Sequence, residues 1–225
     1  MVVGSKDFKV RLFDLSSGKL AQDIQNEVDG HVNRVFCTKL DPQNPHILFS
    51  GSWDSYVLIN DLRKREAVGN FQGPYVCGES IDVRGNSILV GSYRSDNYLN
   101  VYDLRTFERA ESLAWGGQGG GFIYSSRWWQ CKDVKSDVLV AGSSNSNDIK
   151  VFKKRNQDEQ EESKEGESSF FEINHISNTS GGVLCMDISP DNSSLAYGTQ
   201  GGELTMVLGD GFNKEQRRDD DEDDN

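Results

Sequence analysis

Long apolar runs are missing from this sequence of 225 residues. No stretch approaches the ~18 apolar residues that a membrane-spanning helix requires. The opening Met-Val-Val-Gly has neither the basic nor the apolar region of a signal peptide. We therefore expect no membrane partner and a cytoplasmic or nuclear location. The hydrophobic fraction of 35% is still enough to build the core of one large all-β domain or two small ones.

Residues for catalysis are also scarce. The histidines are His31, His46 and His175, and their spacing implies no Ser, Cys or carboxylate partner. The glycine run at 116–121 is followed by neither Lys-Ser nor Lys-Thr, so it predicts a flexible loop rather than a phosphate-binding loop. The sequence predicts no enzyme activity, no catalytic residue and no cofactor.

The net charge of -12 is concentrated in two segments. Residues 156–169 carry about -5 and residues 219–225 about -6, which leaves the rest close to neutral. A nucleic-acid surface needs clustered Lys and Arg, so we expect no nucleic-acid partner. Low hydrophobicity and high charge predict a disordered insertion at about 156–169 and a disordered acidic tail at 213–225. Contact of either segment with a basic partner is the less favoured alternative.

A hairpin pattern organises the chain. Within residues 47–63 an apolar run ends in Ser-Gly-Ser, an acidic turn containing Asp54 follows, and the alternation of Val57 and Ile59 gives the second strand one buried face. Copies recur roughly every 42 to 55 residues, within the range of propeller repeats. The second strands of the copies begin at Val10, Val57, Leu99, Ile149 and Leu204.

Further short strands are expected in each interval between hairpins. They are predicted at 67–71, 76–83, 87–90, 109–115, 126–134, 138–141, 170–176, 183–188 and 195–197. Four short strands per repeat, with no helical periodicity, predict an all-β fold of β-propeller blades, each with four antiparallel strands. About four to five such repeats occupy residues 1–212.

The repeats resemble the WD-repeat (WD40) β-propeller family from Val2 to Leu208. The resemblance rests on the pair Gly30-His31, on the turn Asp187 to Asp191, and on the strand-ending residues Asp14, Asp61 and Asp103. Family members commonly have seven blades, and one of these is completed by strands from both chain ends. The resemblance therefore implies the C-terminal part of a larger propeller, whose missing N-terminal blades belong to a longer chain or are supplied by a partner chain. An open arc has unpaired strand edges, which favour association.

The family's buried network of His, Ser, Asp and Trp is incomplete in this chain. The resemblance implies a structural network of His31, Ser52 and Asp54, with Asn60 at the tryptophan position. The dipeptide Trp53-Asp54 lies in the hairpin turn, outside the register of the family's Trp-Asp pair.

The four cysteines are expected to be small core residues with free thiols. Cys37, Cys131 and Cys185 are predicted at one equivalent place in the innermost strands, with Cys77 displaced by about one residue. Their spacing does not match metal ligands, and equivalent positions in separate blades lie too far apart for a disulfide. We expect no metal site.

Large side chains are predicted to gather on the propeller's top face, where the resemblance implies that partners bind. Aligning the innermost strands on their cysteines places Arg34, Tyr75, Trp128 and Gly182 at equivalent positions on the rim of the central channel. The hairpin turns add Trp53, Tyr93 and Arg94. Trp, Tyr and Arg are enriched in binding hot spots. The alternative is that Trp128 or Trp129 packs between blades, and the alternation favours Trp129 for that role.

The function predicted from these features is a non-enzymatic scaffold that binds other proteins through the top face. One alternative comes from Arg63 and Arg105, in Asp61-Leu62-Arg63 and Asp103-Leu104-Arg105. These endings resemble the Asp-x-Arg motif of propellers that serve as substrate receptors of cullin-RING ubiquitin ligases, where the arginine binds the adaptor. A more distant alternative is an enzyme with an unrecognised site in the channel.

Overall fold

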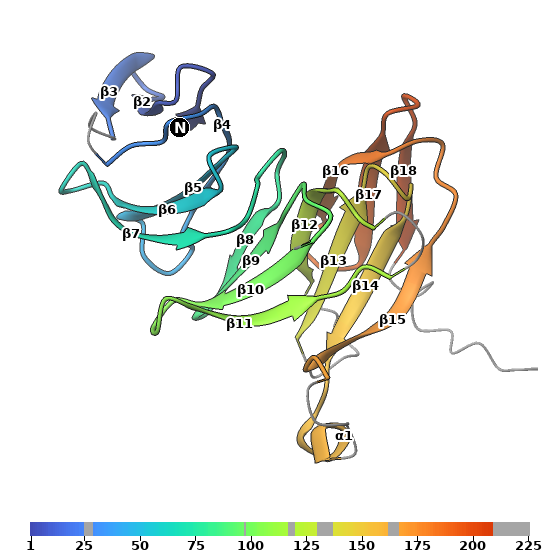
Figure 1. The fold of residues 1–225 in the computed structure, drawn as a ribbon. Coiled ribbons are helices and arrows are strands. Elements are labelled where there is room, and N and C mark those ends of the chain that lie inside the picture. Colours follow the sequence, from blue (N-terminus) through green and yellow to red (C-terminus); the bar gives the residue numbers. More distant parts are fainter. Residues whose placement is uncertain (25–28, 97, 117–119, 130–136, 162–166, 209–225) are drawn as a thin grey trace, which may run out of the picture.

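The computed structural model describes residues 1–24, 29–96, 98–116, 120–129, 137–161 and 167–208. These residues form five antiparallel sheets of three or four strands, and each sheet consists of strands that are consecutive in the chain (Figure 1). We call the sheets blades 1 to 5.

The strands of each blade follow one another in space as they do in sequence, from innermost to outermost. Blade 1 contains β1 (Val2–Gly4), β2 (Val10–Asp14) and β3 (Lys19–Asp23); blade 2 contains β4 (Val35–Leu40), β5 (Ile47–Ser52), β6 (Tyr56–Asp61) and β7 (Glu66–Gln72); blade 3 contains β8 (Ile81–Arg84), β9 (Ser87–Gly91), β10 (Leu99–Asp103) and β11 (Glu108–Leu113); blade 4 contains β12 (Ile123–Trp129), β13 (Val138–Ser143), β14 (Ile149–Lys154) and β15 (Phe170–Ile176); blade 5 contains β16 (Val183–Ile188), β17 (Ser194–Thr199) and β18 (Leu204–Leu208). The prediction of an all-β fold of short-stranded blades is confirmed.

The core lies between consecutive blades, since each blade packs a face against the next. Four clusters of buried apolar side chains separate blades 1 and 2, 2 and 3, 3 and 4, and 4 and 5. The strands β1, β2 and β3 of blade 1 correspond to the second, third and fourth strands of blades 2 to 4. With this numbering, a glycine in the second strand of all five blades pairs with an aliphatic residue near the start of the third. A Cβ on Gly51 would lie 2.7 Å from Ile81, and one on Gly91 would lie 2.4 Å from Ile123. The repeated glycine therefore lets the next blade approach closely.

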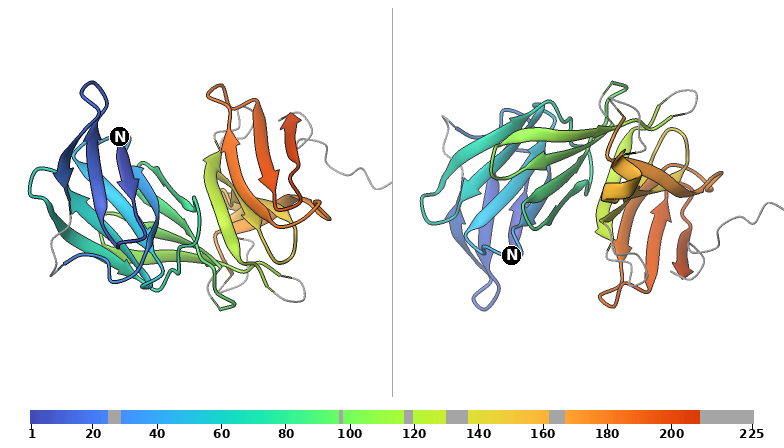
Figure 2. Two further views of the ribbon diagram at one scale, coloured as in Figure 1. Left: turned by 90° about the horizontal axis from the view of Figure 1, so that it is seen from above. Right: turned by 90° about the horizontal axis from the view of Figure 1, so that it is seen from below.

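The two ends of the arc are open. Figure 2 shows the blades following one another along an arc, with blades 1 and 5 at its ends. The first apolar residue of the third strand is 0% exposed in blades 1 to 4, at Val10, Val57, Leu99 and Ile149. The equivalent Leu204 of blade 5 is 81% exposed, because no described blade covers that face.

The innermost strand of blade 4 differs from the prediction. The strand expected at 126–134 is observed at Ile123–Trp129. The prediction used Cys131 as its anchor, and this residue lies outside the described part of the chain. The place opposite the repeated Gly142, which corresponds to Cys37 opposite Gly51, is occupied by Ser125. The predicted equivalence of Cys131 with Cys37 is therefore wrong.

One short helix interrupts the all-β pattern. The helix α1 (Gln157–Glu161) lies inside the insertion that was predicted to be disordered, and that prediction is wrong for these residues. The Glu159 side chain accepts a hydrogen bond from the backbone amide of Asn156 at 2.7 Å, and the Gln160 amide donates to the Asn156 carbonyl. The first of these contacts is one half of a capping box, in which the side chain at the third helical position satisfies the amide of the N-cap residue. Among the described residues, no helix has the length and apolar character needed to cross a membrane.

Candidate protein-interaction site

A repeated backbone hydrogen bond identifies equivalent positions on the top face. The residue that follows the second strand donates its amide hydrogen to a carbonyl on the connection into the innermost strand. The four pairs are Trp53 to Arg34 at 3.4 Å, Tyr93 to Tyr75 at 2.8 Å, Ser144 to Phe122 at 2.9 Å and Gln200 to Gly182 at 2.8 Å. The structure thus places Arg34, Tyr75 and Gly182 at equivalent positions, as the sequence suggested, and adds Phe122 as the fourth member.

The prediction that Trp128 belongs to this group is wrong. Trp128 is buried near the other end of β12, in the core between blades 3 and 4, with its ring centroid 6.1 Å from that of Phe170. Its backbone amide donates to Asp82 at 2.9 Å. Trp129 packs in the next core and donates its indole N–H to the Asn192 carbonyl at 3.1 Å. Both tryptophans therefore pack between blades.

Half-buried aromatic rings form a continuous run on blades 2 and 3. The Trp53 ring lies 4.7 Å from Phe36 and is stacked on Tyr75 at 5.5 Å with an interplanar angle of 14°. The Arg34 guanidinium lies 5.3 Å from the Trp53 ring centre and 5.7 Å from that of Phe36. A cation over an aromatic face is attracted by the ring quadrupole. We call Arg34, Phe36, Trp53 and Tyr75 the aromatic shelf.

A second aromatic group continues the shelf toward blade 4. The Tyr93 ring lies 4.5 Å from Phe122 and 5.3 Å edge-on from Tyr124, and the Tyr93 amide links this group to Tyr75. Arg94 is exposed and forms an ion pair with Asp96 at 3.0 Å. Phe36, Phe122 and Tyr124 were not predicted from the sequence. A register taken from the apolar pattern instead of the cysteines would have identified Phe122.

A buried hydrogen-bond network supports the turn that carries Trp53. His31 Nδ1 lies 2.7 Å from the Asp54 carboxylate, and His31 Nε2 lies 2.9 Å from Ser50 Oγ. Asn60 Nδ2 donates to the same hydroxyl at 3.0 Å. Because a carboxylate only accepts, Nδ1 carries a proton and donates a hydrogen bond to Asp54. Nε2 also lies 3.2 Å from the Ser50 carbonyl oxygen, so both ring nitrogens of His31 are engaged.

The serine of this network was assigned incorrectly from the sequence. The structure brings His31 and Asp54 together, but their serine partner is Ser50 rather than Ser52. Ser52 points elsewhere, because its hydroxyl donates to the Asn33 carbonyl at 3.1 Å and accepts from the Asp54 amide at 3.2 Å. Residues two apart on a strand share a face, so the alternation did not distinguish the two serines.

Asp54 also fixes the backbone on both sides of the turn. Its carboxylate accepts hydrogen bonds from the backbone amides of Val32, at 3.1 Å, and Tyr56, at 3.0 Å. Burial raises the pKa of the Asp54 carboxyl, but hydrogen bonds from the His31 ring and from these amides outweigh it, so the pKa lies below its ordinary value. The ionised carboxylate thus holds the turn on which Trp53 stands.

The arginines proposed for adaptor binding lie at the opposite end of the blades, on the turns after the third strands. The guanidinium of Arg63 contacts both oxygens of Asp61, at 3.0 and 2.8 Å. Arg105 contacts Asp103 in the same way, at 3.1 and 2.7 Å. The hydrogen bonds from Arg105 lower the pKa of Asp103 to about 2. Each exposed arginine is therefore held by its own turn.

The described cysteines are free thiols. Cys37 and Cys77 are buried, whereas Cys185 is exposed on the open face of blade 5. Burial raises the pKa of the Cys37 thiol to about 11. Cys77 packs near the start of the innermost strand of blade 3, and Ser80 lies opposite the repeated Gly91. The predicted displacement of Cys77 by about one residue is therefore wrong, because Cys77 lies three residues before the equivalent position, Ser80.

Polar side chains along the innermost strands pair with one another across blades. Arg127 of blade 4 binds the Glu79 carbonyl at 2.7 Å and its carboxylate at 2.9 Å. Asp82 of blade 3 accepts from Lys39 of blade 2 at 2.8 Å and from the Trp128 amide of blade 4 at 2.9 Å. These contacts connect neighbouring blades.

Two comparisons with known proteins agree with this fold. Residues 22–61, which contain the Asp54 network, match the family model described as WD domain, G-beta repeat. A solved structure titled "Structure of U3-55K" superposes with a TM-score of 0.70 over 92% of the chain, at 16% sequence identity. The chain spans 57% of the length of that protein. At this identity the likeness concerns the fold. Residues 22–61 are accordingly similar to a WD40 repeat, and the described blades form an open arc with a β-propeller fold.

Proposed function

We propose that this protein is a non-enzymatic scaffold that binds other proteins through its top face. The observation that carries the proposal is the aromatic shelf, where three half-buried rings and one guanidinium stack across two blades. WD40 propellers are typically interaction scaffolds. Tryptophan, tyrosine and arginine dominate binding hot spots, because each combines a large contact area with a polar group. We propose the cytoplasm or the nucleus as the compartment.

The rigidity of the shelf supports binding without a large conformational change. Trp53 stands on a turn fixed by three hydrogen bonds to the Asp54 carboxylate. A rigid surface loses little conformational entropy when a partner binds. The shelf therefore suits a partner that presents apolar or aromatic side chains, with a carboxylate or carbonyl near Arg34.

The test compares variants on the two faces. The tagged chain and the double variant Arg34→Ala with Trp53→Ala are used to recover partners, which are then quantified by mass spectrometry. The matched control is Lys64→Ala, on the turn at the opposite end of blade 2. Loss of a discrete set of proteins with the top-face variant alone supports the proposal. Equal recovery by both variants contradicts it.

The alternative of a cullin-RING substrate receptor has weaker support. Both Arg63 and Arg105 are exposed, which adaptor binding requires, but each is already engaged by two hydrogen bonds to a local aspartate. A purified adaptor propeller tests it directly. Absence of adaptor binding by the wild-type chain would exclude this function, and retained binding after both Arg63→Ala and Arg105→Ala would exclude the role of the two arginines.

We also propose that further blades complete the arc, either from a longer form of the chain or from a partner chain. The supporting observation is that Leu204, Met206 and Leu208 of β18 are 81%, 67% and 61% exposed on one face. A patch of this kind marks an interface. The Leu204→Lys and Met206→Lys double variant should keep the melting temperature of the isolated chain and reduce its self-association in size-exclusion chromatography. A fall of many degrees would show that the face is already covered.

A further inference from the structure

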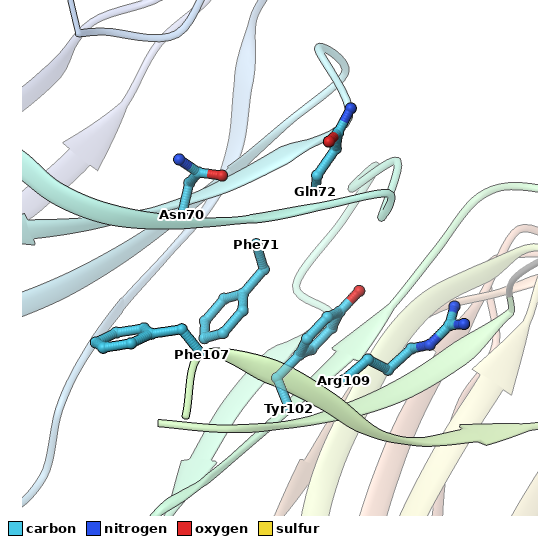
Figure 3. A pocket seen from close by; sticks show the side chains of 6 residues that line it. All are labelled: Asn70, Phe71, Gln72, Tyr102, Phe107 and Arg109. Atoms are coloured by element: carbon cyan, nitrogen blue, oxygen red, sulfur yellow. The ribbon is translucent and has the colours of Figure 1, made fainter. Parts of the chain in front are cut away.

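A groove opens at the outer side of the arc, where blades 2 and 3 diverge. Its volume is ≈ 430 Å³, and its lining comes from β7 and from the β10–β11 hairpin. The lining residues are Asn70, Phe71, Gln72, Tyr102, Phe107 and Arg109. Figure 3 shows Phe71, Tyr102, Phe107 and Arg109 in the space between the two blades, while Asn70 and Gln72 point to the other side of β7. This groove is separate from the aromatic shelf.

A buried hydroxyl without a partner lies in this groove. Tyr102 is 3% exposed, and its hydroxyl oxygen has no hydrogen-bond partner. In Figure 3 the hydroxyl points up from the ring toward the gap between Gln72 and Arg109. Burial raises the pKa of Tyr102 to about 12, so the group is a hydrogen-bond donor at neutral pH. Burying a hydroxyl without a hydrogen-bond partner costs free energy. Its position in a groove indicates a ligand that accepts a hydrogen bond from it.

The groove favours an anionic ligand group. Arg109 contributes a guanidinium, and none of the six lining residues is acidic. Arginine binds carboxylates with well-defined planar geometry. Phe71 and Phe107, with ring centroids 6.3 Å apart, supply an apolar wall beside the Tyr102 ring, which lies 4.6 Å from that of Phe71. A negatively charged hydrogen-bond acceptor at the end of an apolar stem would fit these groups, and the side chain of glutamate has this form.

The equivalent positions of the other blades lack this combination. Tyr102 pairs across the hairpin with Arg109. The corresponding pairs are Phe13 with Leu20, Asn60 with Ala67, and Phe152 with Glu172. Phe107 has a φ of 58°, in the left-handed region, and Gly18 has a φ of 67° in the corresponding turn of blade 1. The repeat itself therefore does not require Tyr102, Arg109 or Phe107.

The edge of β7 offers backbone groups beside the groove. Among the described strands, β7 pairs with β6 alone, so its outer edge is unpaired. An extended peptide can add to such an edge, and every second side chain then points to the same face of the sheet. We infer that an extended segment of a partner protein pairs with the β7 edge and inserts an acidic side chain into the groove, where its carboxylate accepts from Tyr102 and Arg109.

The experiment measures binding of short peptides to the purified full chain by fluorescence polarisation. The probe is a fluorescein-labelled peptide, Thr-Val-Glu-Val-Thr, amidated at its C-terminus. A version with glutamine in place of glutamate removes only the charge. The protein variants are Tyr102→Phe and Arg109→Gln, and the control is Arg105→Gln, which removes a charge from the same hairpin outside the groove. Thermal melts establish that each variant is folded.

The inference predicts saturable binding of the glutamate peptide and at least tenfold weaker binding of the glutamine peptide. Tyr102→Phe should weaken binding about fivefold to tenfold, corresponding to the loss of one hydrogen bond, and Arg109→Gln at least tenfold. Arg105→Gln should stay within twofold. Absence of saturation at millimolar peptide, equal affinity for the two peptides, or wild-type affinity of both groove variants would overturn the inference. None of these results bears on the top face, whose test uses different residues.

Discussion

The Asp54→Asn substitution examines the buried network directly, because it changes one atom in a carboxylate that accepts three hydrogen bonds. The amide has a single acceptor oxygen. If that oxygen faces His31 and Val32, the amide nitrogen faces the Tyr56 amide, and one hydrogen bond is lost, at a cost of about 1 kcal/mol. The bond to His31 loses its charge assistance, which costs about 1 to 2 kcal/mol more. We expect a total loss of about 2 to 3 kcal/mol.

The pH dependence of this variant has a definite sign. The pKa of Asp54 is lowered in the folded protein, so its folded value lies below the value of about 3.9 in the unfolded chain. Asp54 therefore stabilises the fold at pH values above about 4, and that contribution is lost as the pH falls through the folded pKa. The stability difference between the wild type and Asp54→Asn should shrink below pH 4.

The assay is thermal or urea unfolding followed by circular dichroism at several pH values. For a domain of this size, 2 to 3 kcal/mol corresponds to a fall in Tm of about 4 to 12 °C. The matched control is Asp96→Asn, in the equivalent turn of blade 3, where the carboxylate is exposed and pairs with Arg94. Exposed ion pairs contribute little, so its melt should be unchanged. Equal stability of wild type and Asp54→Asn at pH 7, or a difference that persists at low pH, would refute the reasoning.

Three further substitutions test other parts of the structure by the same unfolding assay. Tyr102→Phe removes a buried hydroxyl that has no partner and should raise the free energy of unfolding by about 1 kcal/mol; a decrease would mean that the hydroxyl is paired. Asp82→Ala leaves the Trp128 amide and Lys39 without their acceptor and should lower stability by about 2 to 4 kcal/mol, more than Lys39→Met alone. Gly51→Ala places a Cβ 2.7 Å from Ile81 and should cost about 1 to 3 kcal/mol, whereas Gly198→Ala, on the open face, should cost less.

Strand order and blade number were predictable because they depend on short-range signals. The alternation from Val57 onward and the repeated glycine at Gly51 mark a half-buried strand and the close approach of the next blade. The contact between Asn156 and the Glu159 side chain also has a sequence signal, Asn-x-x-Glu. The acidic composition of the insertion predicts disorder instead.

The positions of individual site residues were less predictable, because they depend on register. Blade 4 has Ser125 at the place where blades 2 and 5 have Cys37 and Cys185. A cysteine used as an anchor therefore placed Trp128 six residues from the true rim position, Phe122. The choice between Ser50 and Ser52 failed for a related reason, since both point to the same face and only distance to His31 separates them. Packing between blades decides such matters, and a single sequence records it only indirectly.

Comparing equivalent positions in the blades distinguishes residues that the fold requires from residues that it tolerates. The second-strand glycine recurs in all five blades, and its role is packing. Tyr102 differs from the residues at the equivalent positions, and its buried hydroxyl has no hydrogen-bond partner. Packing between blades does not explain such a residue. The fold would be at least as stable with phenylalanine there, the residue that blades 1 and 4 carry at this position as Phe13 and Phe152. The proposed peptide site accounts for the Tyr102 hydroxyl, and the packing of the blades does not.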